Sequence, residues 1–232
     1  MDIDLEKFFD TVPQDRLMSL VHNAEVEVLE SETNLEILLK GWKLVARNPR
    51  LRLFVSANLL EIFSNTIWVS SIILVFVTEL LNKTESYWGY SNTAYSIGII
   101  ISGLIAFRLS EKFLAAKWES ILFPLVAMAI VTLTILYFPN AQMFLLFSAL
   151  VGMLSQLKEV PESVFLQETV EENHLVNVYS VLEVISTLAF SVFVLLMSYI
   201  TESFGISISF WLSAICLMIE AILIYIRRDY FK

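Results

Sequence analysis

Residues 120–157, SILFPLVAMAIVTLTILYFPNAQMFLLFSALVGMLSQL, run for 38 positions without a charged side chain. As one straight α-helix this stretch would be about 57 Å long, at 1.5 Å per residue. That length exceeds the hydrocarbon core of a bilayer, which is roughly 30 Å thick. Pro139-Asn140, near the middle of the stretch, is a typical turn signal. The stretch therefore predicts two membrane-spanning helices, at 119–138 and 141–157, joined by a tight hairpin.

Long apolar runs continue on both sides of this hairpin. They predict four further spans, at 51–78, 86–107, 175–200 and 206–226. Composition agrees, because 57% of the 232 residues are hydrophobic and only 17% are charged, whereas soluble chains average about 45–50% and about 25%. The predicted fold class is an all-α membrane protein with six transmembrane helices, which occupy residues 51–226.

Acidic residues are concentrated at the N-terminus. Residues 1–36 hold ten acids and two bases, a balance of −8 within a net charge of −9. The remainder is nearly neutral and lacks the basic footprint of a nucleic-acid-binding protein. The start of the chain also lacks the basic and apolar regions of a signal peptide. We therefore expect no nucleic acid as a partner. The apolar spans predict that the partner is the lipid bilayer.

The basic residues outside the spans predict the orientation of the chain. With six spans the connectors alternate between the two sides, and one of those sides would hold only Lys83. The other side would hold Lys40, Lys43, Arg47, Arg50, Arg52, Arg108, Lys112, Lys117, Lys158, Arg227, Arg228 and Lys232. Basic connectors face the cytoplasm. Residues 24–50 would then form an acidic, then basic, cytoplasmic linker, and 227–232 a cytoplasmic tail.

A polar stripe is predicted along the first span. Asn58, Glu61 and Asn65 are spaced i, i+3, i+7 and fall on one helical face, which Trp68 extends. Ionisable residues within a span are costly and often functional. Glu61 could carry a proton or face a cation if this face lines a cavity. Alternatively, the stripe is a packing face on which Glu61 and Asn65 bond to neighbouring helices.

Two further glutamates lie within predicted spans. Glu183, two turns into the fifth span, could line a path through the membrane or simply reach water at the cytoplasmic end. Glu220 lies about two turns from Arg227, and its expected role is snorkelling or an interfacial pair. Gly98 and Gly103 in the second span are expected to allow close helix approach.

The sequence contains no pattern that indicates an enzyme. Cys216 is the one cysteine, and His22 and His174 are the two histidines, without metal-ligand spacing. A nucleophile elbow and a phosphate-binding loop are also absent from the sequence. We expect no catalytic residues, no cofactor and no metal site.

Two segments resemble one transporter family. Residues 41–68, GWKLVARNPRLRLFVSANLLEIFSNTIW, resemble the entry into the second half of major facilitator superfamily proteins of the macrolide-efflux and siderophore-exporter branch. Residues 164–190 resemble the connector between helices ten and eleven of that branch, with Gln167, Glu172 and Ser180 at matching places. The loop around Arg108 follows the family only loosely.

This resemblance implies half of a major facilitator fold and proton-coupled efflux of small amphiphilic compounds. A small-molecule substrate and a missing N-terminal transporter half are the partners it implies. The expected substrate and proton pathway comprises Asn58, Glu61, Asn65, Trp68 and Glu183. The alternative is an inactive, truncated transporter remnant fused to a mobile-element fragment. The bacterial cell membrane is the expected location.

The N-terminal segment 1–23 resembles a different family, the group II intron reverse transcriptases. Its pattern D-x-x-x-F-F-D-x-V-x-x-D-x-L matches their first catalytic block, and Asp4 falls where that family holds a metal-binding aspartate. Their second block, Tyr-Ala-Asp-Asp, does not occur in the sequence. We therefore expect this fragment to be catalytically inert.

Overall fold

The computed structural model describes residues 34–115 and 117–231. Every regular element in these residues is helical, and no strand occurs among them. The expected reverse-transcriptase-like fragment, 1–23, and most of the acidic part of the expected linker lie outside the described residues.

The helices follow one another with short connections. They are α3 (Asn34–Arg47), α4 (Pro49–Asn65), η1 (Thr66–Trp68), α5 (Ser70–Val75), η2 (Phe76–Leu80), α6 (Ser86–Ala115), α7 (Lys117–Tyr137), α8 (Ala141–Thr169), η3 (Glu172–His174), α9 (Leu175–Phe204), α10 (Ile206–Ile226) and η4 (Arg228–Phe231). The η elements are 3-10 helices except η2, which is a π-helix.

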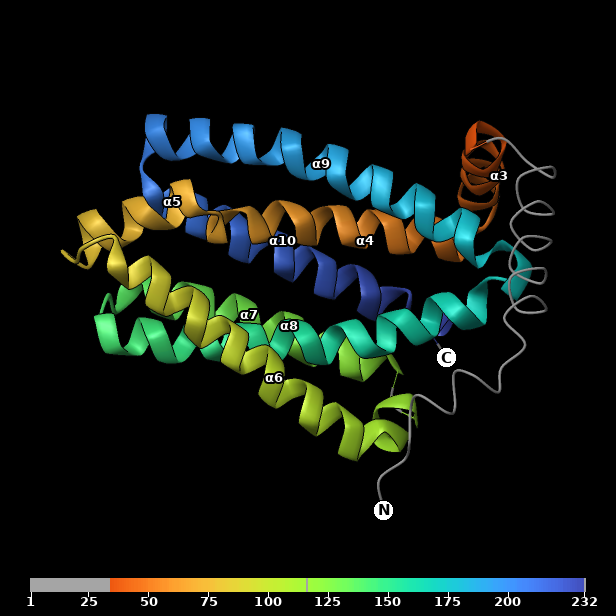
Figure 1. The fold of residues 1–232 in the computed structure, drawn as a ribbon, viewed down its shortest axis with the longest axis horizontal. Coiled ribbons are helices and arrows are strands. Elements are labelled where there is room, and N and C mark those ends of the chain that lie inside the picture. The colour runs from red at the N-terminus through yellow and green to blue at the C-terminus, as the bar shows by residue number, and fades with distance from the viewer. Residues whose placement is uncertain (1–33, 116, 232) are drawn as a thin grey trace, which may run out of the picture.

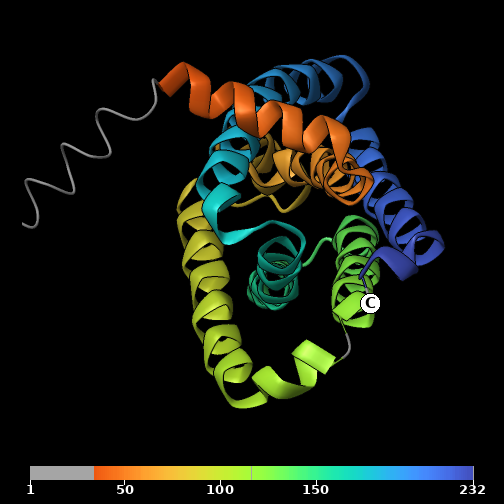
Figure 2. The ribbon, with the colours of Figure 1, turned by 90° about the vertical axis from the view of Figure 1, so that its right-hand side faces the viewer.

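The long helices lie side by side as a bundle, along the longest axis of the molecule (Figure 1). α8 packs against α6 and α7, and Figure 2 shows it between them. α10 packs against α7 and α4, and α4 packs against α9. The C-terminus lies at the end of the bundle where α3 lies (Figure 1). The chain therefore passes along the bundle an even number of times between α3 and its C-terminus.

Helix α3 lies across one end of the bundle and packs against α9 and α4 (Figure 2). It is amphipathic: Val45 is buried against the bundle, whereas Lys43 and Arg47 are exposed. Gly41 permits this packing, because a Cβ at this position would overlap the backbone carbonyl of Asn177 at the start of α9. The amphipathic segment before the first span is thus a docked helix with its basic face outward.

Aromatic rings hold the bundle together at two levels. Phe76 lies between Phe144 of α8 and Phe210 of α10, with ring centroids 5.3 Å and 4.9 Å away. Towards the α3 end, Phe165 contacts both Phe54 and Phe231, at 6.0 Å and 4.5 Å. Buried aromatic pairs contribute roughly 0.5–1.5 kcal/mol beyond their area burial, so these contacts connect the first span to α8 and α10.

Four helices among the described residues are long and apolar enough to cross a membrane. They are Trp118–Tyr137, Ala141–Thr169, Glu172–Phe204 and Ile206–Ile226. The pair Pro49–Trp68 and Ile72–Leu80, bent by 44°, makes a fifth if it is one broken span. The expected span 86–107 lies inside α6, which does not meet the same criterion over the described residues. The count of six spans therefore stays a prediction.

The hairpin predicted at Pro139-Asn140 is confirmed. α7 ends at Tyr137, and the side chain of Asn140 caps α8 by accepting from the backbone N–H groups of Gln142 and Met143 at 2.9 Å and 3.2 Å. An N-terminal cap of this kind satisfies donors that the first turn of a helix leaves unpaired.

Two predicted helix ends are wrong. The segment after 107, expected as a polar connector, continues α6 to Ala115. α8 does not stop at 157 but runs on through Pro161 to Thr169. The continuation is stabilised by an ion pair between Lys158 and Glu162 one turn apart and by burial of Phe165.

Candidate functional site

The first span is broken in its middle, and neighbouring helices satisfy the broken end. α4 ends at Asn65, and Val69 adopts an extended conformation before α5 begins. Ser213 of α10 donates to the backbone carbonyl of Ser64 at 3.1 Å. The two serine hydroxyl oxygens are 2.6 Å apart, so Ser64 donates to Ser213 in turn. Backbone N–H and C=O groups that a break leaves unpaired inside a membrane need hydrogen-bond partners from neighbouring helices, because no water is present there.

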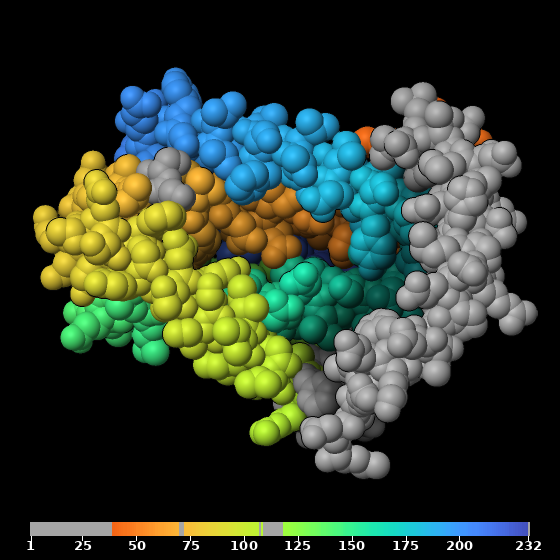
Figure 3. All heavy atoms as spheres, viewed as in Figure 1, coloured from red at the N-terminus to blue at the C-terminus, as the bar shows by residue number. Residues whose placement is uncertain are grey.

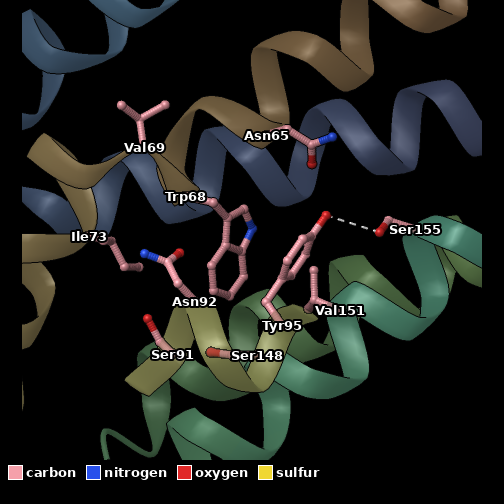
Figure 4. A pocket seen from close by; sticks show the side chains of 10 residues that line it. All are labelled: Asn65, Trp68, Val69, Ile73, Ser91, Asn92, Tyr95, Ser148, Val151 and Ser155. Carbon is pink, nitrogen blue, oxygen red and sulfur yellow. Dashed lines mark hydrogen bonds between the residues drawn. The ribbon is translucent and has the colours of Figure 1, made fainter. Parts of the chain in front are cut away.

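A pocket of about 240 Å³ opens beside this break. Its lining comes from three parts of the chain: the break itself, the first half of α6, and α8 (Figure 4). The lining residues are Asn65, Trp68, Val69, Ile73, Ser91, Asn92, Tyr95, Ser148, Val151 and Ser155. None of these side chains is charged. On the face drawn in Figure 3 the surface is hollowed between the side chains of α4 and those of α8.

The aromatic walls of the pocket are held in place. Trp68 stacks on Phe144 of α8, with centroids 6.4 Å apart and ring planes 10° from parallel. The Tyr95 hydroxyl lies 3.1 Å from Ser155 Oγ. Rigid aromatic walls with a few amide and hydroxyl groups are typical of sites for small, largely apolar molecules. Asn65 and Asn92 supply amide groups to this pocket.

A cluster of four ionisable side chains from α4, α8 and α10 lies beside the pocket, at the level of Glu61. Lys158 Nζ is 2.5 Å from Glu61 Oε2 and 2.7 Å from Glu162 Oε1. Glu220 of α10 completes the group, because oxygens of Glu61, Glu162 and Glu220 all lie within 4.8 Å of one another. Lys158 is 2% exposed and Glu220 is 0% exposed. We call these four residues the charged cluster.

Two residues of α4, one in the pocket and one in the charged cluster, connect the two sites. Asn65, which lines the pocket, donates a long hydrogen bond of 3.5 Å to Glu61 Oε1. Glu61 accepts from Lys158 with its other oxygen. Asn65 therefore contacts both the pocket and Glu61 of the charged cluster.

The five residues expected in the pathway lie in different surroundings. Asn65 and Trp68 line the pocket, and Glu61 belongs to the charged cluster. Asn58 faces α9 at a small void beside Leu182 and Ser186. Glu183 is exposed on α9 and lies outside both groups.

Three members of the cluster were missed or misinterpreted at the level of sequence. Lys158 was expected in a cytoplasmic connector, but it is buried within α8 because its ammonium pairs with Glu61 and Glu162. Glu220 was expected to snorkel towards Arg227, yet it is fully buried beside Glu61. Glu162 was not singled out. The i, i+4 spacing of Lys158 and Glu162 was the available signal.

The profile of the Major Facilitator Superfamily matches residues 35–232. The chain belongs to this superfamily. Membership of this family, together with the long apolar helices, makes it a multi-pass membrane protein. The matched region begins after the fragment that resembles a reverse transcriptase.

Two transporters of Bacillus subtilis (strain 168) are similar to this chain. The uncharacterized MFS-type transporter YfmI is 27% identical over 207 residues, which cover 89% of this chain and 51% of YfmI. The uncharacterized MFS-type transporter YjbB is 28% identical over 187 residues, 81% of this chain and 46% of YjbB. The chain thus spans about half the length of the curated relatives it matches. No solved structure matches it.

Proposed function

We propose that this facilitator forms one half of a proton-coupled efflux transporter for small amphiphilic compounds. The observation that carries the proposal is the adjacency of an uncharged aromatic pocket and a buried charged cluster on the same broken helix. Transporters that couple two movements need a substrate site and an ion site that influence each other. Superfamily membership supports transmembrane transport in general and does not favour an inactive remnant.

The chemistry of the pocket supports an amphiphilic substrate. Trp68 and Tyr95 offer flat apolar surface, whereas Asn65 and Asn92 offer amide groups. The resemblance to the macrolide-efflux and siderophore-exporter branch points to the same class of compound and to export.

The proposed arrangement in the membrane has six spans with both termini in the cytoplasm of a bacterial cell. The even number of passes along the bundle (Figure 1) supports an even number of spans. The exposed basic residues of α3, at the end where the C-terminus lies, support a cytoplasmic position of that end.

A second six-helix half is the proposed partner, because transporters of this architecture bind substrate between two repeats. α9 would face that half or lipid, since large apolar side chains such as Leu188, Val192 and Leu195 are exposed along it. Glu183 is an exposed charge on the same helix. We therefore keep Glu183 as a candidate for the path in the complete transporter.

Retention of the amphiphilic dye Nile red in cells lacking their own efflux pumps tests this function. Cells that express the full chain together with an N-terminal six-helix half should retain less dye than cells that express that half alone, and dissipation of the proton gradient should abolish the difference. Glu61→Gln should also abolish it, at an equal amount of protein in the membrane fraction. Equal dye retention with and without the wild-type chain, when the N-terminal half is present in both, would contradict the proposal.

A further inference from the structure

We propose that Glu220 of α10 is the group that binds and releases the coupling proton, and that Lys158 turns from Glu61 towards Glu220 when the proton leaves. The inference rests on the proton coupling proposed above. It assigns the proton to a residue outside the polar stripe of α4.

Glu220 differs from the other two carboxyl groups in its surroundings. The side chains of Glu61 and Glu162 are 15% and 18% exposed, and each accepts a hydrogen bond from Lys158. Glu220 is 0% exposed, and neither of its oxygens has a hydrogen-bond partner. An ionised carboxylate in such a place would be costly unless it gained a partner or a proton.

The charges around Glu220 do not balance. Among the described residues, the charged groups that act on it are Glu61, Lys158 and Glu162, and Cys216 lies one turn earlier on α10. Three carboxylates and one ammonium sum to −2. A proton on Glu220 leaves −1, which is shared by the two carboxyl groups that retain access to solvent. Protonation of Glu220 therefore removes the charge that is buried most deeply.

A proton fits this place better than a metal ion. The oxygens of the three carboxyl groups lie within 4.8 Å of one another, but the Lys158 ammonium already bonds two of them. A divalent cation would lie against that ammonium and would need several oxygen ligands. A proton needs one oxygen, and Glu220 has two without partners.

Release of the proton would change what holds α4 to α8. Lys158 of α8 bonds Glu61 of α4, and an ionised Glu220 on α10 would compete for the same ammonium. If Lys158 turns to Glu220, the bond between α4 and α8 weakens next to Asn65 and the pocket. The proton on α10 and the substrate in the pocket would then be coupled through Glu61.

Infrared spectroscopy of the full chain in lipid nanodiscs tests this assignment. A protonated carboxyl group has a C=O stretching band separate from that of a carboxylate. At neutral pH the wild-type protein should show this band, and raising the pH should remove it. Glu220→Gln should lack the band. Glu119→Gln, which changes an exposed glutamate of α7, should retain it.

Three results would overturn the assignment. They are the absence of the band in the wild-type protein, an unchanged band in Glu220→Gln, or removal of the band at constant pH by Mn²⁺, which would indicate a metal site. Thermal unfolding would show whether Glu220→Gln folds. If it does not, the wild-type spectra still test the assignment, through the presence of the band and its response to pH and Mn²⁺. The measurement requires no transport, so it can fail while the dye assay succeeds, or the reverse.

Discussion

Lys158 of α8 places its ammonium 2.5 Å from Oε2 of Glu61 on α4, although the two residues are 97 positions apart in the chain. The pair joins the first span to the fourth long helix of the bundle at a level where both side chains are largely buried. It is therefore both a structural bond of the bundle and the neighbour of the pocket.

Removal of Lys158 should destabilise the protein. Lys158→Met leaves three carboxyl groups without their cation, and losing one partner of a buried ion pair costs roughly 3–5 kcal/mol. Thermal unfolding of the full chain in detergent should show a clear fall in midpoint. Lys43→Met, at an exposed position of α3, should leave the midpoint nearly unchanged.

The same measurement separates pairing from mere packing. If Lys158 acts through its charge, Glu61→Gln combined with Lys158→Met should be less destabilised than the sum of the two single variants, by about 0.5–3 kcal/mol. Strictly additive losses would show that the two residues do not interact.

Binding of Nile red should quench the fluorescence of Trp68. The indole ring forms a wall of the pocket and is fixed against Phe144 (Figure 4). Of the five tryptophans in the chain, Trp68 should account for most of the quenching, which Trp68→Phe should remove. Trp211→Phe, at an exposed ring outside the pocket, is the matched control. Equal quenching in Trp68→Phe and the wild type would place the dye elsewhere.

Close packing of α6 on α8 should fail when Gly98 is enlarged. A Cβ at Gly98 would overlap the carbonyl of Ala149, whereas a Cβ at Gly103 meets nothing within 4 Å. Gly98→Leu should therefore lower the free energy of unfolding by about 1–3 kcal/mol or more, because overpacking usually costs that much. Gly103→Leu should have little effect on the isolated chain. Equal effects of the two substitutions would argue against this packing.

The break in the first span should loosen when Ser213 loses its hydroxyl. Ser213→Ala leaves the buried Ser64 carbonyl without this donor, a loss that typically costs about 1–3 kcal/mol. Hydrogen exchange should become faster in peptides covering residues 64–69. Ser56→Ala removes an exposed hydroxyl bound within its own helix and should leave exchange at the break unchanged.

Local features of the sequence predicted part of this fold well. α10 has the predicted bounds, and α7 lies within two residues of them, because uninterrupted apolar length and the Pro139-Asn140 turn determine these helices locally. Close helix approach was predicted at both Gly98 and Gly103. It is found at Gly98, but the prediction for Gly103 is wrong, because a Cβ there would meet nothing within 4 Å.

The charged cluster could not be predicted in the same way. Lys158 was taken for a connector residue because a charge usually ends an apolar span, and its partner Glu61 is distant in sequence. Glu220 was paired in prediction with the nearest base along its own helix. Its actual neighbours come from α4 and α8, a relationship that only the packing of three helices creates.

Proton movement in response to substrate tests the account most directly. The full chain, together with an N-terminal six-helix half, would be reconstituted into liposomes that contain a trapped pH-sensitive dye, without an imposed gradient. Addition of Nile red should then move protons across the membrane in the wild type, but not in Glu61→Gln or Glu220→Gln. Proton movement that is absent from the wild type, or equal in all three proteins, would contradict coupling between the pocket and the charged cluster.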